Sequence, residues 1–169
     1  EIELIQRKEK GFTLIELVIG LAIMSVIIIA MGMTITTLVT NSQETTERSV
    51  VLRQVQNAGY SISHDVQMAE NVILDGTGGF PLTLDIPVDT DQNNDYIVDY
   101  LFDGNKLKRQ VYDSSHTLIK ETMVAEYIDV DETTFTDLGS NTYELTVRAS
   151  TGEAVAERSY QVKQRLGSV

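Results

Sequence analysis

The chain has 169 residues, no cysteine and a formal net charge of −12 at pH 7. Without cysteine, disulfides and thiolate metal sites are excluded. The strong negative charge disfavours direct binding to nucleic acid, which needs clustered lysine and arginine, and adsorption to anionic lipid surfaces.

The N-terminal segment consists of a short leader followed by a long apolar run. The leader ends at Gly11, and no charged residue occurs over positions 17–43. Its basic residues are Arg7, Lys8 and Lys10. At about 1.5 Å per residue, the run is long enough to cross a hydrocarbon core of about 30 Å as a helix. The basic residues before it predict a cytoplasmic N-terminus and an exported remainder.

The apolar run differs from an ordinary secretory signal peptide. Such a peptide has an apolar region of about 7–15 residues and is cleaved after it. Here the run is longer, and the only cleavage site that we identify lies before it. We therefore expect the apolar helix to stay on the mature protein.

Glu16 is a carboxylate inside the apolar zone. A charge at the centre of a membrane helix costs about 2.5–3.5 kcal/mol on insertion scales, and less toward the helix end. The residue alone leaves two interpretations open. Glu16 is either a paired, functional group, or a first-turn carboxylate at headgroup level that the helix dipole favours.

The region after the apolar run shows helical periodicity. Hydrophobic residues recur there in steps of three and four: Val51, Val55, Ala58, Ile62, Val66 (or Asp65), Ala69 and Val72. This spacing predicts one continuous helix over about 13–71, apolar all round in its first half and amphipathic in its second. Gly59 is a weak point, at a cost of about 1 kcal/mol relative to alanine. Three glycines within 75–79 predict the end of the helix.

The rest of the chain is expected to be β. Alternating patterns predict strands over 81–86, 96–102, 106–112, 117–120, 123–130, 142–149 and 154–164. Asp103, Gly104 and Asn105 predict a hairpin turn, and Arg109 is expected on the same face as Leu107. The fold class is therefore α+β, with a long N-terminal helix packed on an antiparallel sheet. The expected segments are a leader over 1–11, a membrane-spanning helix over 12–39, its amphipathic continuation over 40–75 and a β region over 76–169.

An acidic segment between two predicted strands offers alternating oxygen ligands. Asp89, Asp91, Asn93 and Asp95 match the first half of an EF-hand-type calcium loop. The sixth position of that loop holds asparagine instead of glycine, and the bidentate glutamate at the twelfth is missing. Two interpretations stay open: a calcium site, or a solvated turn in which Asp and Asn are simply favoured turn residues.

No pattern in the chain predicts an enzyme. The two histidines, His64 and His116, do not have the spacing of paired metal ligands on a helix. The sequence contains no G-x-S-x-G motif, and the glycines of 76–79 follow a helix instead of opening one, which argues against a P-loop. We therefore expect a protein without catalytic residues.

The order of the N-terminal parts resembles a known processing signal. Lys-Gly-Phe-Thr-Leu-Ile-Glu at 10–16, followed by an uncharged helix, looks like the class III signal peptide of type IV pilins and type II secretion pseudopilins. The resemblance implies cleavage by prepilin peptidase between Gly11 and Phe12 and N-methylation of Phe12. It also implies that Glu16 pairs with the terminal amine of a neighbouring subunit during assembly. Two charges in an apolar filament core offset one another only if they meet.

The order of the later elements resembles the type IV pilin fold over most of the chain. The segment 63–72, the Pro-Leu-Thr-Leu strand at 81–84 and the strands near Tyr100 and Arg109 look most like J-type minor pseudopilins and W-type minor pilins, although those families are often longer. The resemblance implies a structural minor subunit of a type IV pilus or type II secretion filament. Its partners would be prepilin peptidase, other pilin or pseudopilin subunits and, before assembly, the lipid of the inner membrane. The alternative is a single-pass, membrane-anchored exported binding module in which the acidic segment holds calcium.

Overall fold

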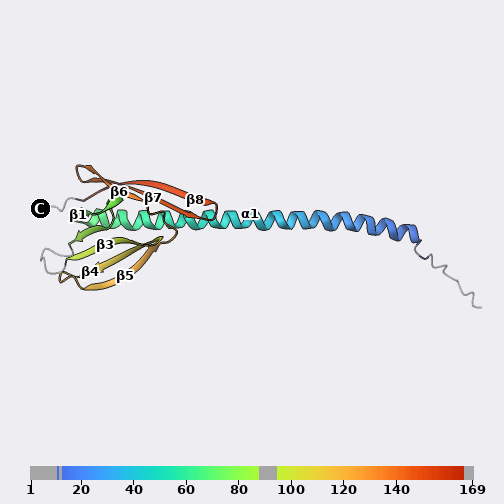
Figure 1. Ribbon diagram of the computed structural model, residues 1–169, viewed down its shortest axis with the longest axis horizontal. Helices are drawn as coiled ribbons and strands as arrows, with labels where there is room; N and C mark the ends of the chain where they lie inside the picture. The colour runs from blue at the N-terminus through green and yellow to red at the C-terminus, as the bar shows by residue number, and fades with distance from the viewer. Residues whose placement is uncertain (1–10, 12, 88–94, 166–169) are drawn as a thin grey trace, which may run out of the picture. The chain divides into compact units, whose positions relative to one another are not determined.

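The computed structural model describes residues 11, 13–87 and 95–165 (Figure 1). Its first element is the helix α1 (Leu14–Met68), which contains a stretch long and apolar enough to cross a membrane. The chain divides into two compact units, Glu1–Gln43 and Glu44–Val169. We describe each unit separately.

In the first unit, α1 exposes its large apolar side chains along its whole surface. The hydroxyl groups in the same stretch donate to backbone carbonyls three or four residues earlier. These residues are Ser25, Thr34, Thr36, Thr37 and Thr40. Since each hydroxyl is satisfied within the helix, the segment presents a surface compatible with lipid or with other apolar helices.

In the second unit, α1 is amphipathic as predicted. It buries Val51, Val55, Ala58, Ile62 and Val66, which are the face that the helical spacing predicted. The helix ends at Met68, three residues earlier than expected, because Asn71 already begins a strand. The predicted helix and its buried face are therefore confirmed, and only its last turn differs.

Two antiparallel sheets flank this part of α1 (Figure 1). The first has the order β1-β2-β3-β4-β5 and the second β6-β7-β8. The strands of the first sheet are β1 (Asn71–Leu74), β2 (Leu82–Ile86), β3 (Tyr96–Asp103), β4 (Lys106–Tyr112) and β5 (Leu118–Ala125). The strands of the second sheet are β6 (Thr134–Gly139), β7 (Thr142–Thr151) and β8 (Ala154–Lys163). A short 3-10 helix, η1 (Thr77–Gly79), lies between β1 and β2 in the sequence.

The α+β architecture agrees with the expectation, whereas several strand boundaries differ. The predicted strand over 123–130 is wrong beyond Ala125, because Tyr127 has a φ of 61° and Ile128 forms only an isolated bridge to Ala149. The strands β1 and β6 were not predicted. The hairpin between β3 and β4 is confirmed by their register, in which Asp103 pairs with Lys106.

The core lies between α1 and the two sheets. Its apolar residues come from α1 and from the inward faces of both sheets, such as Leu82, Tyr100, Leu107, Leu145 and Val147. Gly59 is part of this packing, because a Cβ there would overlap the ring of Tyr160 on β8. Gly59 was expected to weaken the helix. In the structure, its lack of a side chain allows β8 to pack closely against α1.

The polar side chains of Asp65, Gln164 and Gln54 help to fix the position of α1 within this unit. Asp65 is 4% exposed, and its Oδ2 accepts hydrogen bonds from Arg109 Nε at 2.6 Å and Tyr100 Oη at 2.7 Å. Gln164 donates to the carbonyls of Ala69 and Glu70 just beyond the helix end, at 3.0 and 2.7 Å. Gln54 Oε1 accepts from the backbone amide of Glu126 at 2.9 Å. The helix is thus bound to both sheets by polar groups as well as by packing.

Candidate functional site

The candidate site at the N-terminus begins where α1 starts. Gly11 is described and exposed, whereas Phe12 lies outside the described residues. Thr13 precedes the first residue of the helix, and Glu16 lies in the first turn. The expected cleavage site therefore precedes the helix in the sequence, with Phe12 and Thr13 between Gly11 and its first residue, Leu14.

Thr13 and Glu16 form a reciprocal cap at this helix end. Glu16 Oε2 accepts hydrogen bonds from the backbone amide and from the hydroxyl of Thr13, both at 2.9 Å. In return, the Thr13 hydroxyl accepts from the Glu16 amide at 3.4 Å. This is the geometry of a capping box, which satisfies amides that have no partner within the helix.

The cap gives Glu16 a partner in its own chain. The carboxylate is nevertheless exposed, and it remains reachable by a second donor. The geometry is thus compatible with both interpretations of Glu16, as a first-turn carboxylate and as an acceptor for a cation of another subunit. The contact with Thr13 was not predicted, although the T-x-x-E spacing at 13–16 is a recognised sequence signal for it.

The proposed calcium ligands are only partly within the described residues. Asp89, Asp91 and Asn93 lie outside them, and Asp95 is described. Asp95 Oδ1 is buried, and it has no hydrogen-bond partner among the described residues. Within residues 11, 13–87 and 95–165, no group of three or more His, Asp or Glu side chains is arranged to hold a metal ion.

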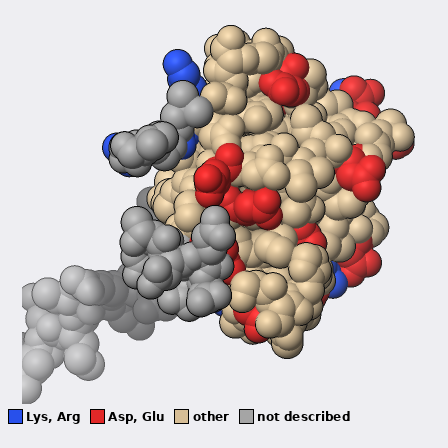
Figure 2. Space-filling view, turned by 90° about the vertical axis from the view of Figure 1, so that its left-hand side faces the viewer, with Lys and Arg blue, Asp and Glu red and all other residues tan. Residues whose placement is uncertain are grey.

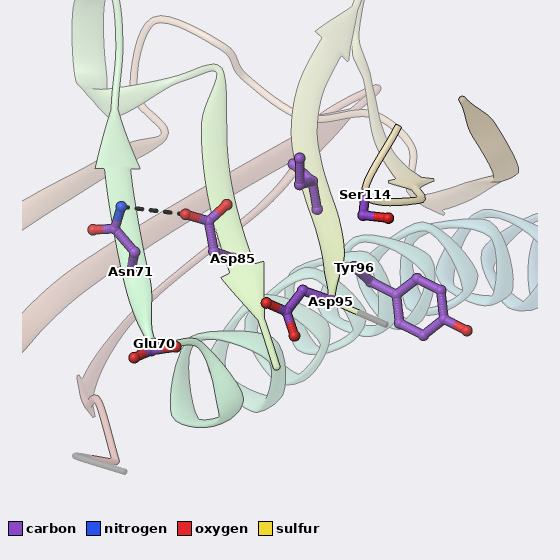
Figure 3. A pocket seen from close by; sticks show the side chains of 7 residues that line it. Glu70, Asn71, Asp85, Asp95, Tyr96 and Ser114 are labelled. Atoms are coloured by element: carbon purple, nitrogen blue, oxygen red, sulfur yellow. Dashed lines mark hydrogen bonds between the residues drawn. The ribbon is translucent and has the colours of Figure 1, made fainter. Parts of the chain in front are cut away.

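A pocket of about 430 Å³ adjoins Asp95 (Figure 3). Its other carboxylates are Glu70, in the connection between α1 and β1, and Asp85 on β2. Asn71 Nδ2 donates to Asp85 Oδ2 at 3.2 Å, and Figure 3 shows these two side chains pointing toward one another. The acidic residues of this end of the domain thus belong to different elements instead of one ligand loop.

The two histidines lie apart, in different contacts. His64 stacks on Tyr60 and lies 3.5 Å from Asp65 Oδ1, and His116 lies against the ring of Tyr112. Asp65 itself is the buried centre of the contact between α1 and β4. The sequence placed Asp65 as an alternative to Val66 on the buried face of the helix. It placed Arg109 on the same face of its strand as Leu107, but it did not pair the two residues.

Residues 6–38 match the family model of the prokaryotic N-terminal methylation motif. No curated protein and no solved structure matches the chain. The match covers residues 6–11 of the expected leader, Glu16 and most of the apolar part of α1, and it indicates a type IV pilin-like precursor that prepilin peptidase processes. The motif implies a structural subunit instead of an enzyme, anchored in a membrane by its apolar helix and assembling with other pilins. The architecture, a long N-terminal helix packed against antiparallel sheets, is type IV pilin-like.

Proposed function

We propose that the protein is a minor structural subunit of a type IV pilus or a type II secretion filament. It is cleaved between Gly11 and Phe12, methylated on the new amine of Phe12 and packed into the filament through the apolar part of α1. The observation that carries the proposal is the match of residues 6–38 to the N-terminal methylation motif, and the expected cleavage site between Gly11 and Phe12 precedes α1, which begins at Leu14.

The physical chemistry of the helix supports assembly through this segment. Its apolar side chains are exposed, so the segment needs either lipid or other helices around it. Glu16 would meet the methylated amine of a neighbouring subunit in that environment, where each charge is costly unless it is paired. The charged pair would set the position of one helix relative to the next.

The experiment that tests this function is the intact mass of the mature protein. The full chain is isolated from membranes of two hosts, one with an active prepilin peptidase and one with an inactive peptidase. We expect the loss of residues 1–11 and the gain of one methyl group in the first host only. An uncut chain in both hosts would contradict the proposal and favour the membrane-anchored binding module.

The assignment as a minor subunit has its own test. It predicts that quantitative mass spectrometry of purified filaments finds this chain at far lower abundance than another pilin subunit. Equal or higher abundance would assign it as a major subunit and leave the filament function intact.

A second proposal concerns calcium. Asp89, Asp91, Asn93 and Asp95 are proposed as oxygen ligands. The buried Oδ1 of Asp95, which has no hydrogen-bond partner among the described residues, supports the proposal. Calcium that binds only the folded state raises the thermal midpoint. We expect calcium to raise the thermal midpoint of the full chain in detergent. The rise should be smaller for Asp95→Asn, and it should be as large as in the parent for the control Asp131→Asn. Equal midpoints in calcium and in chelator would contradict it.

A further inference from the structure

We propose that the backbone between Asp75 and Gly76 is a site of spontaneous covalent modification, at which aspartate converts to isoaspartate in the folded protein. The product carries the main chain through the side-chain carboxyl carbon, so it adds one carbon atom to the backbone of the connection between β1 and η1. The inference goes beyond the filament function and does not depend on it. The reaction needs only water, without an enzyme or a cofactor.

Most carboxylates of this acidic chain lack the neighbour that the reaction needs. Figure 2 shows patches of Asp and Glu on one end of the domain. An aspartate cyclises most easily when glycine follows it, because glycine has no side chain to hinder the attack of its amide nitrogen. The sequence contains two such pairs, Asp75-Gly76 and Asp103-Gly104, and no asparagine is followed by glycine. The structure distinguishes these two pairs.

The reaction has two steps, and one water molecule is released and then consumed. In the first step, the nitrogen of Gly76 bonds to Cγ of the protonated Asp75 carboxyl group, whose hydroxyl leaves as water with the amide proton. The product is a five-membered succinimide ring. In the second step, water adds to one ring carbonyl and breaks its bond to nitrogen. Opening at Cγ restores aspartate, whereas opening at the α-carbonyl carbon leaves isoaspartate with a free α-carboxylate.

The carboxyl group of Asp75 is held against the nitrogen that attacks it. Gly76 N donates a hydrogen bond to Asp75 Oδ1 at 2.8 Å, and this oxygen is bonded directly to Cγ. The amide proton therefore points at the group from which the water leaves. Asp75 is exposed, so solvent reaches the site for the second step. Groups held in reacting positions gain a large factor in the rate of an intramolecular step.

The fold also requires the glycine of this pair. Gly76 has a φ of 69°, in the left-handed region that favours glycine. A Cβ at this position would lie 2.5 Å from the carbonyl oxygen of Phe80. A larger residue, which would hinder the cyclisation, therefore does not fit without strain. The reactive pair is a consequence of the path that the backbone takes after β1.

Asp103 is held in a different way. Lys108 Nζ lies 2.8 Å from Asp103 Oδ2, and the hydrogen bond and charge of Lys108 lower the pKa of the Asp103 carboxyl group. The ionised carboxylate is the poorer reactant, because water leaves only from the protonated group. Asp103 also pairs with Lys106 in the register of β3 and β4, so the ladder fixes the turn that contains Gly104. We therefore expect Asp103 to react much more slowly than Asp75.

The modified bond lies in a connection that contacts the second sheet. The connection is closed by a hydrogen bond from Asp75 N to the carbonyl oxygen of Pro81 at 3.2 Å. Within it, Gly79 of η1 lies so close to β6 that a Cβ would overlap the carbonyl oxygen of Phe135. An additional backbone atom just before this contact displaces η1 from β6. Isoaspartate at position 75 should therefore weaken the packing between the two sheets and lower the thermal midpoint.

Timed incubation of the folded full chain in detergent, in water labelled with heavy oxygen, tests the site. Each opening of the succinimide leaves one labelled oxygen in the aspartate or isoaspartate product. In peptide maps, label and isoaspartate should accumulate at least about tenfold faster at Asp75 than at Asp103. In urea, where no fold holds either pair, the two rates should approach one another. Equal rates in the folded chain, or a ratio that urea leaves unchanged, would overturn the proposal.

Asp75→Glu is the variant that tests the structural effect, because its longer side chain would have to close a six-membered ring, which forms far more slowly. Asp103→Glu is the matched control. Incubation should lower the thermal midpoint of the parent and of Asp103→Glu, in proportion to the isoaspartate at position 75, and leave that of Asp75→Glu unchanged. An equal fall in Asp75→Glu, or a parent that keeps its midpoint while isoaspartate accumulates, would overturn the effect on packing.

Discussion

The carboxylate of Glu16 accepts two hydrogen bonds from Thr13, one from its backbone amide and one from its hydroxyl, each at 2.9 Å. This contact means that Glu16 has a local structural role in addition to the charge role proposed in assembly. The two roles can be separated, because glutamine can accept the same hydrogen bonds without the charge. Leucine removes both the charge and the acceptor.

We predict that Glu16→Gln and Glu16→Leu both insert into the membrane, and that both fail to assemble. Removing one partner of a buried ion pair costs about 3–5 kcal/mol, which corresponds to a decrease of more than about a hundredfold in filament entry. Loss of the cap alone costs only about 0.5–2 kcal/mol. Filament entry is measured in sheared fractions, and insertion by carbonate extraction of membranes. If Glu16→Gln assembled like the parent, capping and not charge would be the function of Glu16.

The pair formed by Asp65 and Arg109 predicts a large effect on stability. Arg109→Met leaves the buried carboxylate of Asp65 without its cation, at a cost of about 3–5 kcal/mol in the free energy of unfolding. The matched control is Lys108→Met on the same strand. Lys108 pairs with the largely exposed carboxylates of Asp103 at 2.8 Å and Glu121 at 3.3 Å, and such pairs contribute about 0–1 kcal/mol.

Urea unfolding of the full chain in detergent measures both variants. Equal losses for the two would show that the burial of Asp65 does not govern the energy of its ion pair. The double variant Asp65→Leu with Arg109→Met should recover part of the stability that Arg109→Met loses, because no unpaired charge is then buried.

Local spacing explains which parts of the fold the sequence predicted. The buried face of α1 follows from the helical period alone, and the hairpin between β3 and β4 follows from its turn residues and the alternation on both sides. Arg109 was predicted on the same face of its strand as Leu107, and the structure buries Leu107 and binds Arg109 to Asp65 on α1. These features depend on residues close together in the sequence.

The features that were missed depend on contacts between distant residues. Val72 continues the helical spacing, so β1 looked like the last turn of α1, and only its pairing with β2 makes it a strand. Strand β6 has a single buried hydrophobic residue, Phe135, and its sequence does not reveal that it pairs with β7 in a second sheet. At the site, the position of Glu16 was evident from the sequence, whereas the burial of Asp65 against Tyr100 and Arg109 required the tertiary structure.

The burial of Tyr100 predicts a loss of stability at alkaline pH. Burial raises the pKa of Tyr100, and the negative charge of Asp65 raises it further. In the unfolded chain the phenol ionises near pH 10. Above that pH the unfolded state loses a proton that the folded state keeps, so the free energy of unfolding falls as pH rises, by up to about 1.4 kcal/mol per pH unit from this group.

The alkaline prediction is checked by urea unfolding at a series of pH values on both sides of pH 10. Tyr100→Phe should start less stable by about 1 kcal/mol, because Ser61 and Asp65 lose a hydrogen-bond partner. Its stability should then fall less steeply above pH 10. Tyr60→Phe, which removes an exposed phenol, serves as the control. A slope for Tyr100→Phe as steep as that of the parent would assign the alkaline loss to other groups.

The close approach of Tyr160 to Gly59 predicts the reverse of the usual effect of replacing a glycine in a helix. Alanine is favoured over glycine by about 1 kcal/mol in a helix interior. At position 59, however, its Cβ would overlap the Tyr160 ring, and overpacking of a core costs about 1–3 kcal/mol. We therefore expect Gly59→Ala to lower the thermal midpoint, whereas Asn57→Ala, on the exposed side of the same helix, should raise it slightly. If Gly59→Ala raised the midpoint as well, β8 would have room to move away from α1, and the packing between them would be looser than the structure indicates.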